Sequence, residues 1–237
     1  MIWQRVRPSA GRLMVIVGGQ CRKVGKSALV VDLIRAFPER RWTAVKITPY
    51  AEDGCPVKGA RCKCASFEHL VAIRKEKNRG GETDTARFLA AGAKRALWVQ
   101  TKRGRLSDAL AQLEKALAGG GDVIFESDAL VKFWRPELFL MVLDPRKADF
   151  KASARAAERF ADAFVLRSPD FRVGKGRRAP WDTRARFLHP MGYSLPARMQ
   201  NFVRQHFHLP GHLKLGHGGV FLVDRDWKVQ DNVSLRV

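Results

Sequence analysis

The sequence predicts an α/β fold in which helices cover both faces of a doubly wound, mainly parallel sheet. Short apolar runs rich in β-forming residues alternate with helical patterns along most of the chain. The hydrophobic share, 46% of 237 residues, is large enough to build a sizeable core. Strand and helix signals weaken near residue 171, so we expect a main domain over residues 1–170 and a small basic C-terminal extension over residues 171–237.

The first predicted strand leads into the most specific motif of the chain. An apolar run over 13–17 passes through a glycine pair and a polar loop to Gly-Lys-Ser at 25–27, and an apolar helix over 28–34 follows. Strand, loop and helix in this order form the context of a phosphate-binding loop, or P-loop. In such a loop the backbone amides and the helix N-terminus surround the phosphates, the lysine adds a full charge and the serine ligates Mg²⁺. The candidate nucleotide contacts in this loop are Gly19, Arg22, Lys23, Val24, Gly25, Lys26, Ser27 and Ala28.

The spacing of this loop differs from the usual pattern in one respect. The pattern G-x-x-x-x-G-K-[ST] places its first glycine at Gln20, whereas the glycines present are Gly18 and Gly19. We therefore expect a loop that is one residue longer than the standard form. A plain glycine-rich turn with a surface lysine is the structural alternative, but the strand and the helix both fall where the P-loop requires them.

Two later strands bring charged residues toward the same edge of the sheet. The strand over 41–48 carries Lys46, and the strand over 123–126 ends at Glu126. Ligands bind at the carboxyl edge in doubly wound folds, so Lys46 is either a phosphate contact or an ordinary strand-end lysine in solvent. Glu126 is either a loop carboxylate or, as we expect, a residue that organises Mg²⁺ or orients the attacking group. Lys26 and Glu126 are thus the candidate catalytic residues, and Ser27 and Glu126 the candidate Mg²⁺ ligands.

The remaining elements continue the alternation of strands and helices. A leucine stripe at helical spacing predicts an amphipathic helix over 106–117 that serves the core. The other predicted elements, in chain order, are a helix starting at Asp84 and closed by Ala91-Gly92-Ala93, and then a strand over 95–99, a strand over 138–144, a helix starting near 149, a strand over 162–166 and a C-terminal hairpin around 221–229.

Three of the four cysteines gather in the segment between the second strand and the Asp84 helix. Cys55, Cys62, Cys64 and His69 could complete a tetrahedral Zn²⁺ site or hold part of an iron–sulfur cluster. Cys-x-Cys spacing is less typical of structural zinc than Cys-x₂-Cys, so free thiols in a basic loop are the alternative. Four cysteines in a chain of this length do not make a disulfide framework, and no run approaches the length of a membrane span. We therefore expect a cytoplasmic protein.

The formal net charge of +21 favours polyanionic partners, whether nucleotide, nucleic acid or an acidic surface. Aromatic residues lie among the basic residues of the C-terminal region and could stack on bases, although such a run is more often a solvated surface. The basic residues are Arg172, Lys175, Arg177, Arg178, Arg184 and Arg186, and the aromatic ones Phe171, Trp181 and Phe187. The histidines of this region lie between prolines and glycines, so we interpret them as loop residues and not as a metal cluster.

The order of these features resembles the molybdopterin-guanine dinucleotide biosynthesis protein B (MobB) family of P-loop GTPases over about residues 13 to 167. The similar segments are Lys46-Ile47-Thr48, Asp84-Thr85-Ala86-Arg87 with Ala91-Gly92-Ala93, and Val123-Ile124-Phe125-Glu126. The longer loop, the cysteine insertion, Pro49-Tyr50 and Ser127 after Glu126 depart from the family pattern. The resemblance implies a P-loop NTPase fold and nucleotide binding more than it implies the molybdenum-cofactor role.

Three functions follow from these residues. The leading one is a Mg²⁺-dependent protein that binds GTP or ATP, with slow NTPase or switch activity. The same loop would also serve a small-molecule kinase, with Asp53 or Asp84 as the base that activates the acceptor. The basic C-terminal region would suit a nucleic-acid-binding protein. The preference for adenine or guanine nucleotides stays open, because no Asn-Lys-x-Asp motif is visible. Asp149-Phe150-Lys151 does follow a strand, at a place where residues that recognise the base would lie. A partner protein and a homodimer also stay open.

Overall fold

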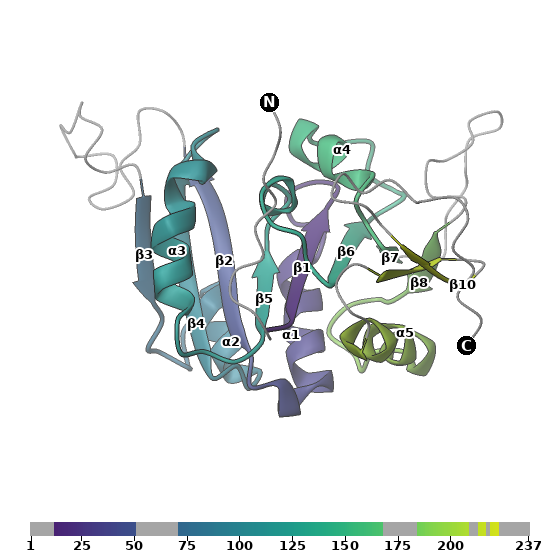
Figure 1. Ribbon diagram of the computed structural model, residues 1–237, viewed down its shortest axis with the longest axis horizontal. Helices are drawn as coiled ribbons and strands as arrows, with labels where there is room; N and C mark the ends of the chain where they lie inside the picture. Colours follow the sequence, from purple (N-terminus) through teal and green to yellow (C-terminus); the bar gives the residue numbers. More distant parts are fainter. Residues whose placement is uncertain (1–11, 51–70, 168–183, 209–212, 217–218, 223–237) are drawn as a thin grey trace.

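The computed structural model describes residues 12–50, 71–167, 184–208, 213–216 and 219–222 (Figure 1). Its main feature is an eight-stranded sheet with the strand order β3-β4-β2-β5-β1-β6-β7-β8. All neighbours in this sheet are parallel except β3 and β4, which are antiparallel. The strands are β1 (Met14–Gly19), β2 (Thr43–Tyr50), β3 (Val71–Lys75), β4 (Arg95–Lys102), β5 (Val123–Glu126), β6 (Leu138–Leu143), β7 (Ala163–Leu166) and β8 (Ala185–Leu188).

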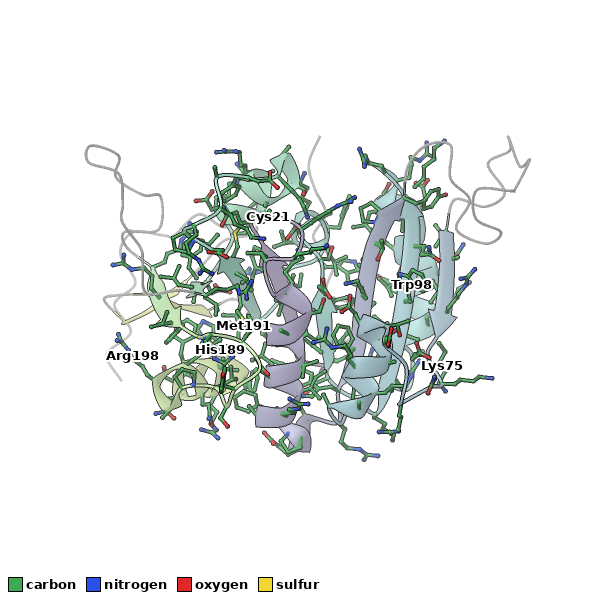
Figure 2. The ribbon with its side chains drawn as sticks, turned by 180° about the vertical axis from the view of Figure 1, so that it is seen from behind. Cys21, Lys75, Trp98, His189, Met191 and Arg198 are labelled. Atoms are coloured by element: carbon green, nitrogen blue, oxygen red, sulfur yellow. The ribbon has the colours of Figure 1, made fainter. Side chains whose placement is uncertain are left out.

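Helices cover both faces of this sheet, as the alternating pattern predicts. Helix α3 lies on one face and α1 on the other, as the views from the front and from behind agree (Figures 1 and 2). The helices are α1 (Lys26–Ala36), α2 (Asp84–Ala90), α3 (Leu110–Leu117), α4 (Ala152–Glu158) and α5 (Ala197–His208). Single 3-10 turns lie at Pro38–Arg40, Leu106–Ala109 and Leu130–Lys132. None of the helices in the described ranges is long and apolar enough to cross a membrane.

Two hydrophobic cores lie on the two faces because successive strand residues point to opposite sides. On β1, Val15 and Val17 join the core beneath α1, α2 and α5, whereas Met14 and Ile16 join the core beneath α3 and α4. Every residue of β1 is buried, which explains why this strand is a continuous apolar run and not an alternating one. The sheet is thus the α/β, mainly parallel fold that the sequence predicts.

The C-terminal region contributes two elements that our sequence analysis does not predict. Strand β8 pairs with β7 in the main sheet, and α5 packs Met199 and Val203 into the core that contains α1. A boundary at residue 170 stays a prediction, because the segment that would separate the two parts lies outside the described residues. The C-terminal hairpin pairs β9 (Leu213–Gly216) with β10 (Gly219–Leu222), so it precedes the predicted position around 221–229.

Strand β3 lies between β2 and α2, in a segment for which the sequence analysis predicts no strand or helix. It pairs antiparallel with β4 at the edge of the sheet, and its five residues are only partly buried or exposed. Such a strand lacks the continuous apolar run of the central strands, because one of its edges and part of its faces remain open. The predicted cysteine cluster lies outside the described residues.

Candidate functional site

The loop between β1 and α1 has the conformation of a helix-capping turn that opens toward the carboxyl edge of the sheet. Gly25 is the N-cap of α1 with φ 107°, a value that favours glycine. Its carbonyl accepts the first helical hydrogen bond from the Leu29 amide at 3.0 Å. Lys23 also has a positive φ, 56°, which is uncommon for a residue with a β-carbon. The N-terminus of α1 thus begins at this loop and has no side-chain cap.

Gln20 occupies the position where the usual P-loop pattern has its first glycine, and its side chain holds the loop in place. Its side-chain oxygen accepts a hydrogen bond from the Asp144 amide at 3.0 Å, and its side-chain amide donates to the Lys147 carbonyl. Its own carbonyl accepts from the Lys151 amide at 3.0 Å. Gly18 and Gly19 belong to the end of β1, so the side chain of Gln20 fastens the loop to the segment after β6 where the usual pattern has a glycine.

Lys26 bends back over the loop. Its Nζ donates to the Cys21 carbonyl at 3.0 Å, and a β-carbon on Gly19 would lie 2.8 Å from its Cγ, which real side chains do not tolerate. Burial lowers the pKa of Lys26 below its usual value. The charges of Lys151 and Lys46 act in the same direction, whereas Asp128 and Glu126 oppose it.

Four polar side chains meet at the first turn of α1. Lys46 on β2 lies in register with Glu126 on β5, and both side chains point to the α1 face of the sheet. The Ser27 hydroxyl donates to Glu126 Oε2 at 2.7 Å, and Lys46 Nζ lies 3.0 Å from both carboxylate oxygens of Glu126. Lys46 also contacts the carboxylate of Asp84, which is the first residue of α2. The structure thus brings three predicted site residues, Ser27, Lys46 and Glu126, into direct contact.

This cluster places Lys46 among carboxylates and not in solvent. Burial alone would lower the pKa of Lys46, but the charges and hydrogen bonds of Glu126 and Asp84 outweigh burial and raise it. Only 7% of the Glu126 side chain and 22% of the Lys46 side chain are exposed. Lys46 therefore remains an ammonium group throughout the physiological pH range.

Asp128 is a site residue that our sequence reasoning missed. Its Oδ1 accepts a hydrogen bond from the Gly19 amide at 2.6 Å, and its Oδ2 lies 3.8 Å from Lys151 Nζ. The Gly19 amide is thus engaged by a carboxylate and does not point into the loop. In the sequence we considered Lys151 as part of a segment that recognises the nucleotide base. In the structure it lies beside the loop, where its charge lowers the pKa of Lys26. Asp128 lies two residues after the strand-end Glu126, and a carboxylate at this spacing belongs to no motif by which it could be recognised in the sequence.

The other predicted contacts are spread over the same loop. Arg22 and Lys23 are exposed, Val24 is buried in the α1 core, and Ala28 lies in the first turn of α1. Within the described ranges no group of three or more His, Cys, Asp and Glu side chains could hold a metal ion. Cys55, Cys62, Cys64 and His69 lie outside these ranges.

Two of the residues considered for nucleic-acid binding have structural roles. The Arg184 guanidinium donates to the carbonyls of Glu158 and Arg159 at 2.6 and 2.8 Å, so it caps the end of α4. Phe187 is buried in the core and cannot stack on a base, contrary to our expectation. Most of the other residues considered for this role lie outside the described part of the chain.

A separate cleft of about 380 Å³ opens at the opposite, amino-terminal edge of the sheet. It lies between the residues that precede β2, β4 and β5, with Arg41, Lys94 and Asp122 in its wall. Ligands of open α/β sheets bind at the carboxyl ends of the strands, so this cleft carries no part of the site around α1.

No protein-family model matches the chain, and a search of curated proteins gives no significant match. Among solved structures the chain is similar to LpxK from Aquifex aeolicus in complex with ATP, with a TM-score of 0.45 and 17% sequence identity. The match covers 76% of this chain and 54% of LpxK, so the chain spans about half the length of that structure. A likeness this distant carries no conclusion about ligand or activity. The chain's own mainly parallel sheet, flanking helices and strand-loop-helix unit agree with the α/β fold of P-loop NTPase type that the sequence predicts.

Proposed function

We propose that the protein binds a nucleoside triphosphate with Mg²⁺ in the loop between β1 and α1. The observation that carries this proposal is the contact of Ser27, Glu126 and Lys46 at the first turn of α1, beside the half-buried Lys26. Backbone amides and the helix N-terminus attract phosphate oxygens, and two lysines neutralise their charge. This combination suits a triphosphate better than it suits a neutral ligand.

The residues present also suit the magnesium ion that a triphosphate brings. Mg²⁺ prefers oxygen ligands, and the Ser27 hydroxyl and the Glu126 carboxylate offer them 2.7 Å apart. The ion would neutralise charge on the β- and γ-phosphates. Because Lys46 occupies both oxygens of Glu126, we expect the carboxylate to act on the ion through water and Lys46 to approach the γ-phosphate.

Slow hydrolysis is the activity that fits this arrangement. Glu126 accepts hydrogen bonds from Ser27 and Lys46 through both of its oxygens, so it is poorly placed to take a proton from an attacking water. A GTP preference would agree with the resemblance to the MobB family, whereas an ATP preference would separate the chain from it.

The test is nucleotide titration by calorimetry with ATP and GTP, each with Mg²⁺ and with chelator. Lys26→Ala should abolish binding and leave the melting temperature within a few degrees of the wild type. Lys75→Ala is the control, because Lys75 is an exposed lysine on edge strand β3 (Figure 2) and its loss changes the net charge equally. Undiminished nucleotide affinity in the Lys26 variant would contradict the proposal.

A small-molecule kinase is the second candidate, and Asp84 favours it. This carboxylate contacts Lys46 and remains 28% exposed at the rim of the site, where it could accept a proton from an acceptor hydroxyl. Nucleotide turnover that rises at least tenfold with one metabolite, and that Asp84→Asn removes, would select this candidate. Turnover that no added metabolite stimulates would leave the slow NTPase.

A further inference from the structure

The site has two sides, which lie on either side of β1. Strands β5 and β2 lie on one side of β1 and bring Glu126 and Lys46 to Ser27. Strands β6 and β7 lie on the other side. If Ser27 and Glu126 held the magnesium ion of a triphosphate, the γ-phosphate would lie beside them. The nucleoside end of the nucleotide would then extend toward β6 and β7.

Arg167 is a basic residue that the fold places on this second side. It follows β7 directly, and its amide donates to the Leu143 carbonyl at 3.0 Å, at the carboxyl edge of the sheet. Its side chain lies against the N-cap of α1, because a β-carbon on Gly25 would be 3.3 Å from Arg167 Cδ and 3.5 Å from its Nε. The arginine thus borders the loop itself.

The guanidinium of Arg167 is incompletely satisfied where it lies. Its Nε is buried and has no hydrogen-bond partner in the part of the chain that the structure describes. The charge of Arg167 helps to lower the pKa of the nearby acid Asp144, but the carboxylate of Asp144 accepts its hydrogen bonds from the side chain and the amide of Arg146, each at 3.2 Å. A buried donor without an acceptor costs free energy, so an acceptor that arrives from outside would be bound strongly.

A rigid turn after β8 fixes the surroundings of Arg167. Asp32 on α1 accepts hydrogen bonds from His189 Nε2 at 2.9 Å and from the Gly192 amide at 2.8 Å, and Asp32, His189 and Met191 are buried. These hydrogen bonds hold Met191, with φ 62°, beside Gly25. A β-carbon added to Gly25 would lie 3.2 Å from Met191 Cγ. His189 and Met191 lie beside α1 in Figure 2. The wall beside the loop is therefore preformed, which favours a bound ligand over a loose contact.

We propose that Arg167 binds the phosphates nearest the nucleoside, the α- and β-phosphates, of the nucleotide that the loop holds. The proposal rests on the proposed function and adds the direction in which the nucleotide lies. A nucleoside diphosphate and a triphosphate share these two phosphates, whereas only the triphosphate has the γ-phosphate that faces Glu126 and Lys46. Arg167 should therefore contribute equally to the affinity for both nucleotides.

The experiment compares wild-type protein with Arg167→Met, Arg167→Lys and the control Arg198→Met. Arg198 is an exposed arginine at the start of α5, and its loss changes the net charge equally (Figure 2). Calorimetry with a nucleoside triphosphate and its diphosphate gives both dissociation constants, and a thermal melt without nucleotide gives the stability. We expect Arg167→Met to weaken both nucleotides by the same factor, about 10- to 100-fold, as for one lost charge-assisted hydrogen bond. Arg167→Lys should retain part of the affinity, because an ammonium group keeps the positive charge but lacks the paired N–H donors of the guanidinium.

The melt separates binding from structure. Removal of an unsatisfied buried donor should leave the melting temperature of the nucleotide-free protein unchanged or higher. A drop of several degrees would assign Arg167 a structural role and overturn the proposal. So would a loss confined to the triphosphate, or losses no larger than those of Arg198→Met. These results would leave the proposed function intact if Lys26→Ala still abolishes binding, whereas absence of binding to the wild type would overturn both.

Discussion

Replacing Lys46 by methionine tests the charge cluster at the first turn of α1. The attraction between Nζ and a carboxylate oxygen at 3.0 Å is about 5 kcal/mol at an effective dielectric constant of about 20. Desolvation of both groups offsets much of this, and loss of one partner of a buried pair costs about 3–5 kcal/mol. Since Lys46 and Asp84 keep some solvent contact, we expect the lower end, about 3 kcal/mol, or a melting temperature lower by about 6 to 12 °C.

Urea unfolding followed by tryptophan fluorescence measures this loss. Lys75→Met is the matched control, because Lys75 also lies on a strand but is exposed, and its loss should stay within about 0.5 kcal/mol. Combining Lys46→Met with Glu126→Gln should cost less than the sum of the single changes, by about 1–2 kcal/mol, since the neutral amide needs no cation. Additive losses, or equal losses for Lys46→Met and Lys75→Met, would refute the charge cluster as a source of stability.

The pH profile of the wild type gives an independent check on the same group. The pKa of Lys46 is raised above its usual value of 10.5 in the folded protein. Its contribution to stability is therefore complete below pH 10.5 and is lost as the pH rises through the higher folded pKa. The Lys46→Met protein should lack this alkaline loss, whereas identical alkaline profiles for the two proteins would contradict the linkage.

Three further predictions concern the loop and its anchor. Gly19→Ala should weaken triphosphate binding at least about tenfold, because the new β-carbon lies 2.8 Å from Lys26 Cγ; Gly80→Ala, in an open turn, should not. Asp32→Ala should cost about 3 kcal/mol in urea unfolding, since it leaves the buried His189 ring without its carboxylate; a loss below about 1 kcal/mol would contradict this role. Because burial lowers the pKa of Lys26, triphosphate affinity should fall as the pH rises toward 10.5, and Lys26→Arg should flatten that profile; calorimetry across this pH range measures both.

The parts of the fold that could be predicted are those whose burial leaves a simple pattern. Strands β1, β5 and β6 are buried throughout and so appear as continuous apolar runs. Edge strand β3 is only partly buried, and its sequence resembles a loop. Helix α5 does carry a signal, because Met199, Phe202, Val203 and His206 recur at helical spacing, but neighbouring prolines and histidines favoured an irregular interpretation.

The site divides in the same way. Lys46 and Glu126 could be selected because each follows an apolar run at the ligand edge, and the register of β2 with β5 then brings them together. Asp128 and Arg167 lie just beyond strands, where nothing in the local sequence distinguishes them from surface charges. Their positions depend on the packing of the loop against β6 and β7, which is a property of the folded chain. Gln20 belongs to this class too, since its two partners lie more than a hundred residues away.

The charge balance of the site shows why the net charge of +21 says little about it. Around the loop three ammonium groups, of Lys26, Lys46 and Lys151, face three carboxylates, of Asp84, Glu126 and Asp128. These six charges cancel, so the positive charge near the loop comes from Arg22 and Lys23 in the loop itself, from Arg87 beside Asp84 and from Arg167. A magnesium–triphosphate complex is still an anion, so a neutral pocket alone would not attract it. The loop amides, the α1 N-terminus and the unsatisfied guanidinium of Arg167 are the local groups that supply the remaining attraction.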